Sequence, residues 1–85
     1  MPHFFFDTDD GHFRHEDDEG FDLPSLDAAR IEALDALPEM ARNKFPDRDR
    51  RTYSVRVRDK DGTAVYSASL ALVGEWHVPR AGSSS

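Results

Sequence analysis

The sequence contains no cysteine among its 85 residues. Disulfide bonds, thiolate nucleophiles and cysteine-ligated zinc or iron–sulfur sites are therefore excluded together. Long apolar runs are also missing, since the longest near the start is Phe4-Phe5-Phe6. That run is far shorter than a signal-peptide core or a membrane span. We therefore expect a cytoplasmic protein that is not bound to a membrane and is stabilised by packing.

Signatures of catalysis are missing as well. No serine lies in an elbow-like motif, and no glycine-rich loop is present to hold a phosphate group. The acids at 16–19 are contiguous, with no sign of the pocket that paired catalytic carboxylates need. The sequence therefore predicts a non-catalytic protein without a cofactor.

The acid-rich stretch 6–20 has the composition of a metal site but not the spacing. An EF-hand loop beginning at Asp7 would need glycine at its sixth position, and Gly11 falls at the fifth. His12 and His15 are three residues apart, so on a strand they point to opposite faces and do not share an ion. We expect no metal here.

The chain is short and its charge is divided. Its length allows one domain, which we place at residues 1–78, followed by a small polar tail, 79–85, that we expect to be disordered. The net charge is -6, but residues 1–41 carry twelve acids against two arginines, and residues 42–85 carry nine bases against five acids. Such a division favours either head-to-tail association or a polarised surface.

Two Asp-Gly pairs predict two β-hairpins, because glycine readily adopts the positive φ of a tight turn and aspartate tolerates it. The expected turns are Asp10-Gly11 and Asp61-Gly62. The expected strands are 3–9, 12–16, 52–60 and 63–73.

A two-residue turn fixes which side chains face each other. In the second hairpin the apolar face then pairs Val57 with Tyr66, Val55 with Ala68 and Tyr53 with Leu70. In the first hairpin Phe4, Phe6 and Phe13 share a face, and Asp7 faces Arg14 on the other. Each hairpin therefore has one apolar face and one polar face.

A helix is predicted between the hairpins. Ser25 is a good N-cap, and Asp27 favours the positive end of the helix dipole. One helical face is apolar and comprises Leu26, Ala29, Ala33, Leu34, Leu37, Met40 and Ala41. Pro38 predicts a kink or the start of a second short helix, and Phe45-Pro46 is expected to end the helical region.

Two surfaces are candidates for binding a partner. The polar face of the sheet carries Phe5, Arg56 and Arg58, which are candidates for protein contacts, and the two arginines also suit contacts with phosphates. Near the end, Trp76 follows Gly74. Either the last strand extends past its neighbour and offers Trp76 at an unpaired edge, or Gly74 turns the chain and Trp76 covers the core.

Several features occur in an order that resembles a known family: Met1-Pro2, the phenylalanine run, Asp10-Gly11, the acids at 17–19, Leu23-Pro24, an alanine-containing helix and the later Asp-Gly unit. The family comprises small proteobacterial proteins classed as a domain of unknown function, and the resemblance covers about residues 1–72. It implies the fold and a bacterial origin, but no activity and no site residues. A looser fold-level likeness is to antitoxin domains.

We therefore expect an α+β domain of ββαββ order, with a four-stranded antiparallel sheet and one helix, kinked or straight, on one face. The strand order stays open. The expected function is a non-catalytic binding or regulatory module that acts through protein contacts, with an unknown protein or a second copy as partner. The alternative is an antitoxin-like or nucleic-acid-binding regulator.

Overall fold

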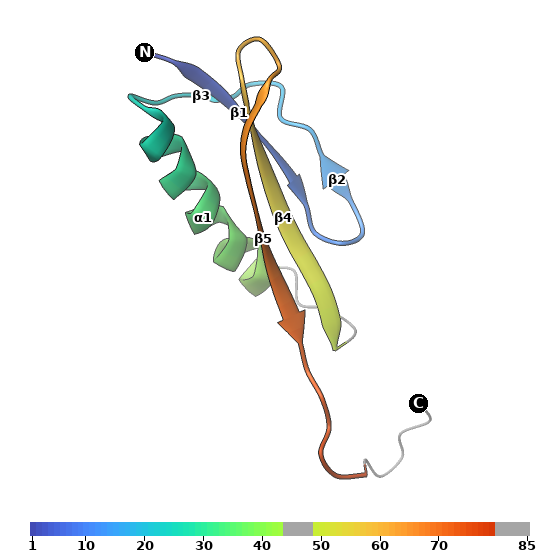
Figure 1. Ribbon diagram of the computed structural model, residues 1–85. Helices are drawn as coiled ribbons and strands as arrows, with labels where there is room; N and C mark the ends of the chain where they lie inside the picture. The colour runs from blue at the N-terminus through green and yellow to red at the C-terminus, as the bar shows by residue number, and fades with distance from the viewer. Residues whose placement is uncertain (44–48, 80–85) are drawn as a thin grey trace.

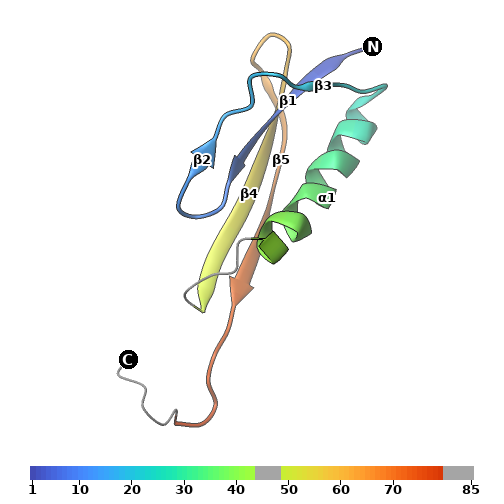
Figure 2. The same cartoon turned by 180° about the vertical axis from the view of Figure 1, so that it is seen from behind.

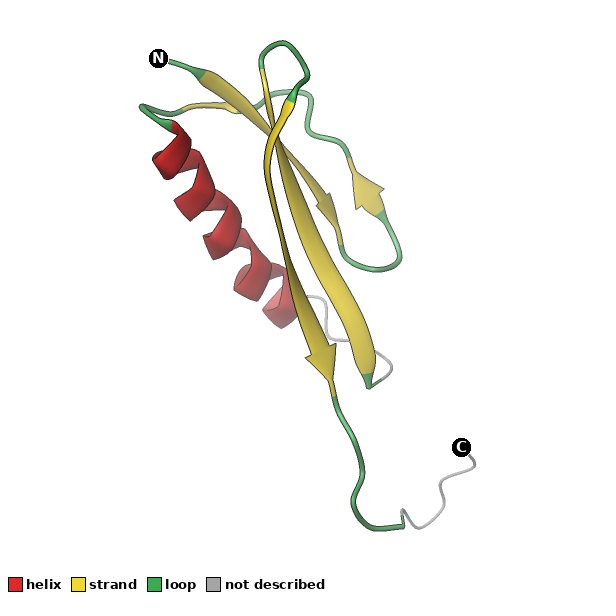
Figure 3. Ribbon diagram, in the orientation of Figure 1, coloured by secondary structure: helices red, strands yellow, loops and turns green. Residues whose placement is uncertain are grey.

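One helix packs against one face of an antiparallel sheet in the computed structural model, which describes residues 1–43 and 49–79 (Figure 1). The elements are β1 (His3–Asp9), β2 (Arg14–His15), β3 (Phe21–Asp22), α1 (Leu26–Asn43), β4 (Arg50–Asp59) and β5 (Ala64–Val73). The strand order is β2-β1-β4-β5, and β3 pairs with β1 on the same edge as β2. Figure 3 shows α1 lying along one side of the strands. The predicted α+β class and antiparallel sheet are confirmed.

The predicted four strands and ββαββ order are wrong, because the sheet has five strands. The missed element is β3, in which only Phe21 and Asp22 pair with β1. A two-residue strand shows no alternation of apolar and polar residues, so its sequence gives no strand signal. Side-chain contacts hold it instead: the Phe21 ring meets Phe6 edge-on at 5.9 Å, and Asp22 accepts a hydrogen bond from His3 at 2.6 Å.

The predicted register of the second hairpin is confirmed at Val57–Tyr66, Val55–Ala68 and Tyr53–Leu70. The turn differs from the prediction. Asp59 N–H donates to the Thr63 carbonyl at 2.9 Å, and Gly62, at φ +86°, closes a three-residue loop. A bulge between Tyr66 and Ala64 takes up the extra residue. The two irregularities cancel, which restores the register.

The predicted register of the first hairpin is wrong, because its loop has four residues, 10–13, instead of two. The Asp10 carboxylate accepts hydrogen bonds from the N–H groups of His12 and Phe13, which stabilises the longer loop. Arg14 therefore lies opposite Asp9 and not opposite Asp7. Phe13 is left 78% exposed in the loop, away from Phe4 and Phe6.

The helix begins as the sequence predicts. Ser25 Oγ accepts the Ala28 N–H at 3.1 Å, which confirms it as the N-cap. α1 runs through Pro38 as one element, so no second helix begins there. The expected end at Phe45-Pro46 lies outside the described residues.

The core lies between α1 and the strands that it covers. Its buried residues are Phe4, Ala29, Ala33, Leu37, Tyr53, Val55 and Val57. Leu26 and Leu34, which were predicted to share the apolar face of the helix, stay exposed. α1 lacks the apolar length that a membrane-spanning helix needs.

The segment after β5 leaves the sheet (Figure 1). β5 ends at Val73 opposite Arg50, and Gly74 N–H donates to the Asp49 carbonyl. Trp76 is 58% exposed and does not belong to the core. Both alternatives for Trp76 are therefore corrected: β5 does not extend past β4, and the indole does not cover the core. Beyond Pro79, the predicted disordered tail lies outside the described residues.

Candidate binding surface on the open sheet face

α1 covers only one face of the sheet, and the opposite face is called the open face (Figure 2). Strand alternation points every second side chain toward this face, because their neighbours Phe4, Val55 and Val57 point into the core. The register then brings polar residues from four strands together: Asp7 and Asp9 from β1, Arg14 from β2, Ser54, Arg56 and Arg58 from β4, and Ser67 and Ser69 from β5.

Asp7 and Arg58 form a two-pronged ion pair at one end of this face. Arg58 Nε donates to Asp7 Oδ2 at 2.6 Å, and Nη2 donates to Oδ1 at 2.9 Å. Asp7 is buried, at 4% exposure, and the pairing with Arg58 holds its pKa below the usual range. The same contact raises the pKa of Arg58. The predicted partner of Asp7 was Arg14, so the structure corrects that pairing.

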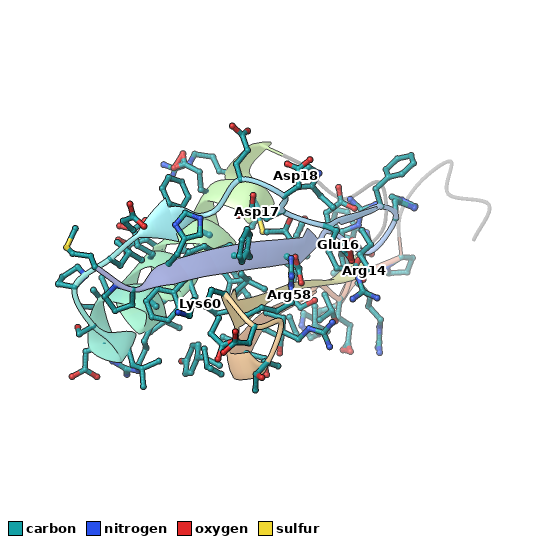
Figure 4. All side chains as sticks on the ribbon, turned by 90° about the horizontal axis from the view of Figure 1, so that it is seen from above. Arg14, Glu16, Asp17, Asp18, Arg58 and Lys60 are labelled. Carbon is teal, nitrogen blue, oxygen red and sulfur yellow. The ribbon has the colours of Figure 1, made fainter. Side chains whose placement is uncertain are left out.

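The acidic segment after β2 is fastened to this ion pair through Asp17. The Asp17 carbonyl accepts from Arg58 Nη2 at 2.9 Å, and the Asp17 N–H donates to Asp7 Oδ1 at 3.1 Å. Figure 4 shows Arg58 and Asp17 near one another beside β1. The segment therefore lies along the β1 edge as an ordered part of the fold.

The Asp17 side chain closes a second set of contacts. Its carboxylate accepts the N–H groups of Phe6, Glu19 and Gly20 at 3.0–3.2 Å. Burial acts to raise the pKa of Asp17, but these three hydrogen bonds outweigh it and leave the pKa lowered. Asp17 thus binds one backbone donor of β1, the Phe6 N–H, and two backbone donors of its own segment.

Phe5 and Arg58, both predicted as partner contacts, are engaged with each other. The Arg58 guanidinium carbon lies 5.1 Å from the centre of the Phe5 ring, within range of a cation–π contact. The ring also meets His3 edge-on at 5.0 Å. Arg58 therefore uses its Nε and Nη2 donors and the face of its guanidinium group for contacts within the molecule.

Arg56 and Arg14 stand differently. They line a groove of about 420 Å³ on the open face, whose other walls include Asp9 and the hydroxyls of Ser54, Ser67 and Ser69. Both arginines are exposed, and neither forms an ion pair within residues 1–43 and 49–79. In the register, Asp7 lies opposite Arg56 and Asp9 opposite Arg14.

The other basic residues do not extend this groove. Lys60 lies beyond Asp59, which pairs with Phe4 at the opposite end of β1 from Arg14 (Figure 4). Arg51 lies two residues before the buried Tyr53 on β4, so its side chain points to the helix side of the sheet. Arg48 lies outside the described residues. The basic residues are thus split between two faces.

The histidines do not form a metal site in the part of the chain that the structure describes, where no three histidine or acidic side chains group around a common point. His3 has a structural role instead. Its Nδ1 donates to Asp22 at 2.6 Å and its Nε2 to the Glu19 carbonyl at 2.7 Å. Both partners accept, so the protonated ring fits best, and the contact with Asp22 raises the pKa of His3.

The pattern of residues that builds these elements matches a known family. The sequence model of a domain of unknown function (DUF6894) matches residues 3–71. The chain belongs to the DUF6894 family. No curated protein and no solved structure matches it. The matched segment runs from β1 into β5, so it contains the groove, whereas Trp76 lies outside it.

Sequence reasoning identified Arg56 in this DUF6894 domain but missed Arg14 as its neighbour. A two-residue turn at Asp10-Gly11 predicts that Arg14 faces Asp7. The residue that indicates the longer loop is Asp10, because its carboxylate accepts hydrogen bonds from backbone N–H groups of that loop. The pairing of β1 with β4 brings Arg14 and Arg56 to one groove. It joins residues about fifty apart in sequence, so no local sequence pattern predicts it.

Proposed function

We propose that this domain is a non-catalytic module that binds an acidic segment of another protein on its open face. Arg14 and Arg56 supply the cationic contacts, and the serines of the groove supply hydrogen-bond donors. The observation that carries the proposal is the contrast between arginines: Arg58 is held by Asp7 and Asp17, whereas neither Arg14 nor Arg56 forms an ion pair in the described residues, although both line a groove with Asp7 and Asp9.

The groove suits a carboxylate better than a nucleic acid. Asp7 and Asp9 line it beside the arginines, so a continuous phosphate backbone would meet negative charge along the β1 side of the groove. A protein segment can place one or two carboxylates between Arg14 and Arg56 and leave its other groups outside. Guanidinium groups bind carboxylates through paired hydrogen bonds, which suits this use.

The experiment measures binding of a fluorescent ten-residue glutamate peptide by anisotropy at low salt. Arg14→Ala/Arg56→Ala is expected to weaken binding by about tenfold or more, because each lost charged contact contributes about 1 kcal/mol or more. Arg30→Ala/Arg42→Ala removes the same charge from α1 and is expected to keep the wild-type affinity.

A single-stranded oligonucleotide of equal length serves as the second probe. Tighter binding of the oligonucleotide, lost in the Arg14→Ala/Arg56→Ala variant, would replace the proposal with the nucleic-acid-binding regulator. Equal peptide affinity for the two double variants would contradict the groove as the site. The bacterial origin and cytoplasmic location expected from the sequence stay predictions.

A further inference from the structure

The outer edge of β5 is unpaired. β5 is the last strand in the order β2-β1-β4-β5, and its pairing with β4 runs from Ala64 to Val73. In the part of the chain that the structure describes, no strand pairs with its other edge. Every second N–H and C=O group of β5 therefore points outward, which is the arrangement that pairs with a strand of another chain.

β5 lacks the features that normally keep an edge from pairing. Its ten residues, AVYSASLALV, include no charged residue and no proline. β4, the inner strand beside it, carries five charged residues. The bulge lies near the Ala64 end, so most of the edge stays regular. Three large apolar side chains are also exposed along it, Val65 at 37%, Leu70 at 39% and Val73 at 65%.

We propose that β5 pairs with β5 of a second copy, antiparallel, about a two-fold axis perpendicular to the sheet. This symmetry keeps the two helices on the same side and joins the two open faces. The small side chains Ser67, Ser69 and Ala71 of the two copies then meet on the open face. On the helix side, Leu70 of one copy lies near Leu70 of the other. This pairing concerns the backbone edge of β5 and goes beyond the proposed function, although Ser67 and Ser69 also line the groove.

The charge distribution favours pairing of two copies through the β5 edge over pairing through the opposite edge. Eight acids lie between residues 7 and 22, on or next to β1, β2 and β3. That edge is three strand spacings, or roughly 14 Å, from β5. Pairing through uncharged β5 brings no like charges together and leaves the two acidic edges at opposite ends of the joined sheet. Pairing through the other edge would bring them into contact.

The first test is the mass in solution, measured by sedimentation equilibrium over a range of concentrations. The wild-type chain is expected to be a dimer. Ser69→Lys places one cation from each copy on the open face along the paired β5 strands and is expected to weaken dimerisation at least tenfold. Thr52→Lys adds the same charge to the open face one strand further in and is expected to stay dimeric.

Circular dichroism of both lysine variants checks that each is folded. A wild-type monomer at all concentrations, species that grow beyond a dimer, or equal weakening by the two variants would overturn the proposal. The Arg14→Ala/Arg56→Ala variant is expected to keep the dimer mass, so failure of the groove and failure of the edge give different results.

The second test uses the absence of native cysteine. Single variants Ser67→Cys, Ser69→Cys and Ala71→Cys are oxidised and examined on a non-reducing gel. The one nearest the two-fold axis is expected to form a disulfide-linked dimer, since facing residues have Cβ atoms about 5 Å apart. Glu32→Cys, exposed on α1, is the control. Equal linkage of the control, or no linkage of the three, would contradict the pairing.

Discussion

Asp7 carries a charge although it is almost fully buried, and its contacts explain how. Two hydrogen bonds from Arg58 and one from the Asp17 N–H satisfy its oxygens. Asp7→Asn removes the charge and leaves Arg58 unpaired. We expect the free energy of unfolding to fall by about 3 kcal/mol, because breaking a buried ion pair leaves its other member uncompensated.

Chemical denaturation measures this loss. Asp18→Asn is the matched control, since Asp18 is exposed and has no contact with Arg58; its effect is expected to stay within about 0.5 kcal/mol. The lowered pKa of Asp7 sets the pH window: its contribution is present above the unfolded value of 3.8 and is lost as the pH falls through the folded value. Equal losses in the two variants would contradict this role.

His3 gives a dependence of opposite sign. Its pKa is raised in the folded chain, first by the Asp22 hydrogen bond and then by the Glu19 carbonyl. Its contribution is therefore present below the unfolded value of 6.5 and is lost as the pH rises through the folded value.

Thermal unfolding of His3→Gln checks this sign. We expect the wild type to exceed the variant in Tm at pH 5.5 by more than it does at pH 9. His12→Gln, in the exposed β1–β2 loop, controls for the loss of a histidine as such. A Tm difference for His3→Gln that is the same at both pH values would refute the assignment.

At the scale of elements, Gly20 connects the acidic segment to β1 and β3. Its φ is +71°, and a Cβ built there would lie 2.5 Å from the Phe4 carbonyl oxygen and 2.6 Å from His3 Nε2. Gly62 also has a positive φ, but nothing lies within 4 Å of its built Cβ. The two glycines therefore separate backbone strain from steric conflict.

Gly62→Ala is expected to lower the free energy of unfolding by about 1 kcal/mol, the cost of a left-handed conformation for alanine. Gly20→Ala adds a clash with backbone and is expected to lower it by about 3 kcal/mol or more. Urea denaturation compares the two variants. A cost at Gly20 no larger than that at Gly62 would show that the segment does not pack against β1 as described.

The elements also show how far the sequence predicts the structure. The second hairpin and the Ser25 N-cap follow from local patterns, since alternation and capping act within a few residues. β3 could not be predicted, because its two residues are held by His3 and Phe6 from another strand. The groove depends on the β1–β4 pairing, and therefore on tertiary structure.

At the scale of the whole molecule, the two edges of the sheet differ in charge. The acidic segment is fastened to β1 by Asp17, at one edge of the sheet, while uncharged β5 forms the other edge. Between them, Arg14 and Arg56 line the groove on the open face. We propose that anions bind on the open face and that a second copy associates through the β5 edge.

The proposed binding of an acidic segment in the groove is tested by locating the bound segment on the protein. Amide chemical shifts of the ¹⁵N-labelled protein would be followed by NMR during titration with the glutamate peptide. We expect the largest changes at the groove residues Arg14, Ser54, Arg56, Ser67 and Ser69, and we expect them to be absent in Arg14→Ala/Arg56→Ala. Changes confined to α1 or to the segment after Val73, or no changes at all, would contradict the proposal.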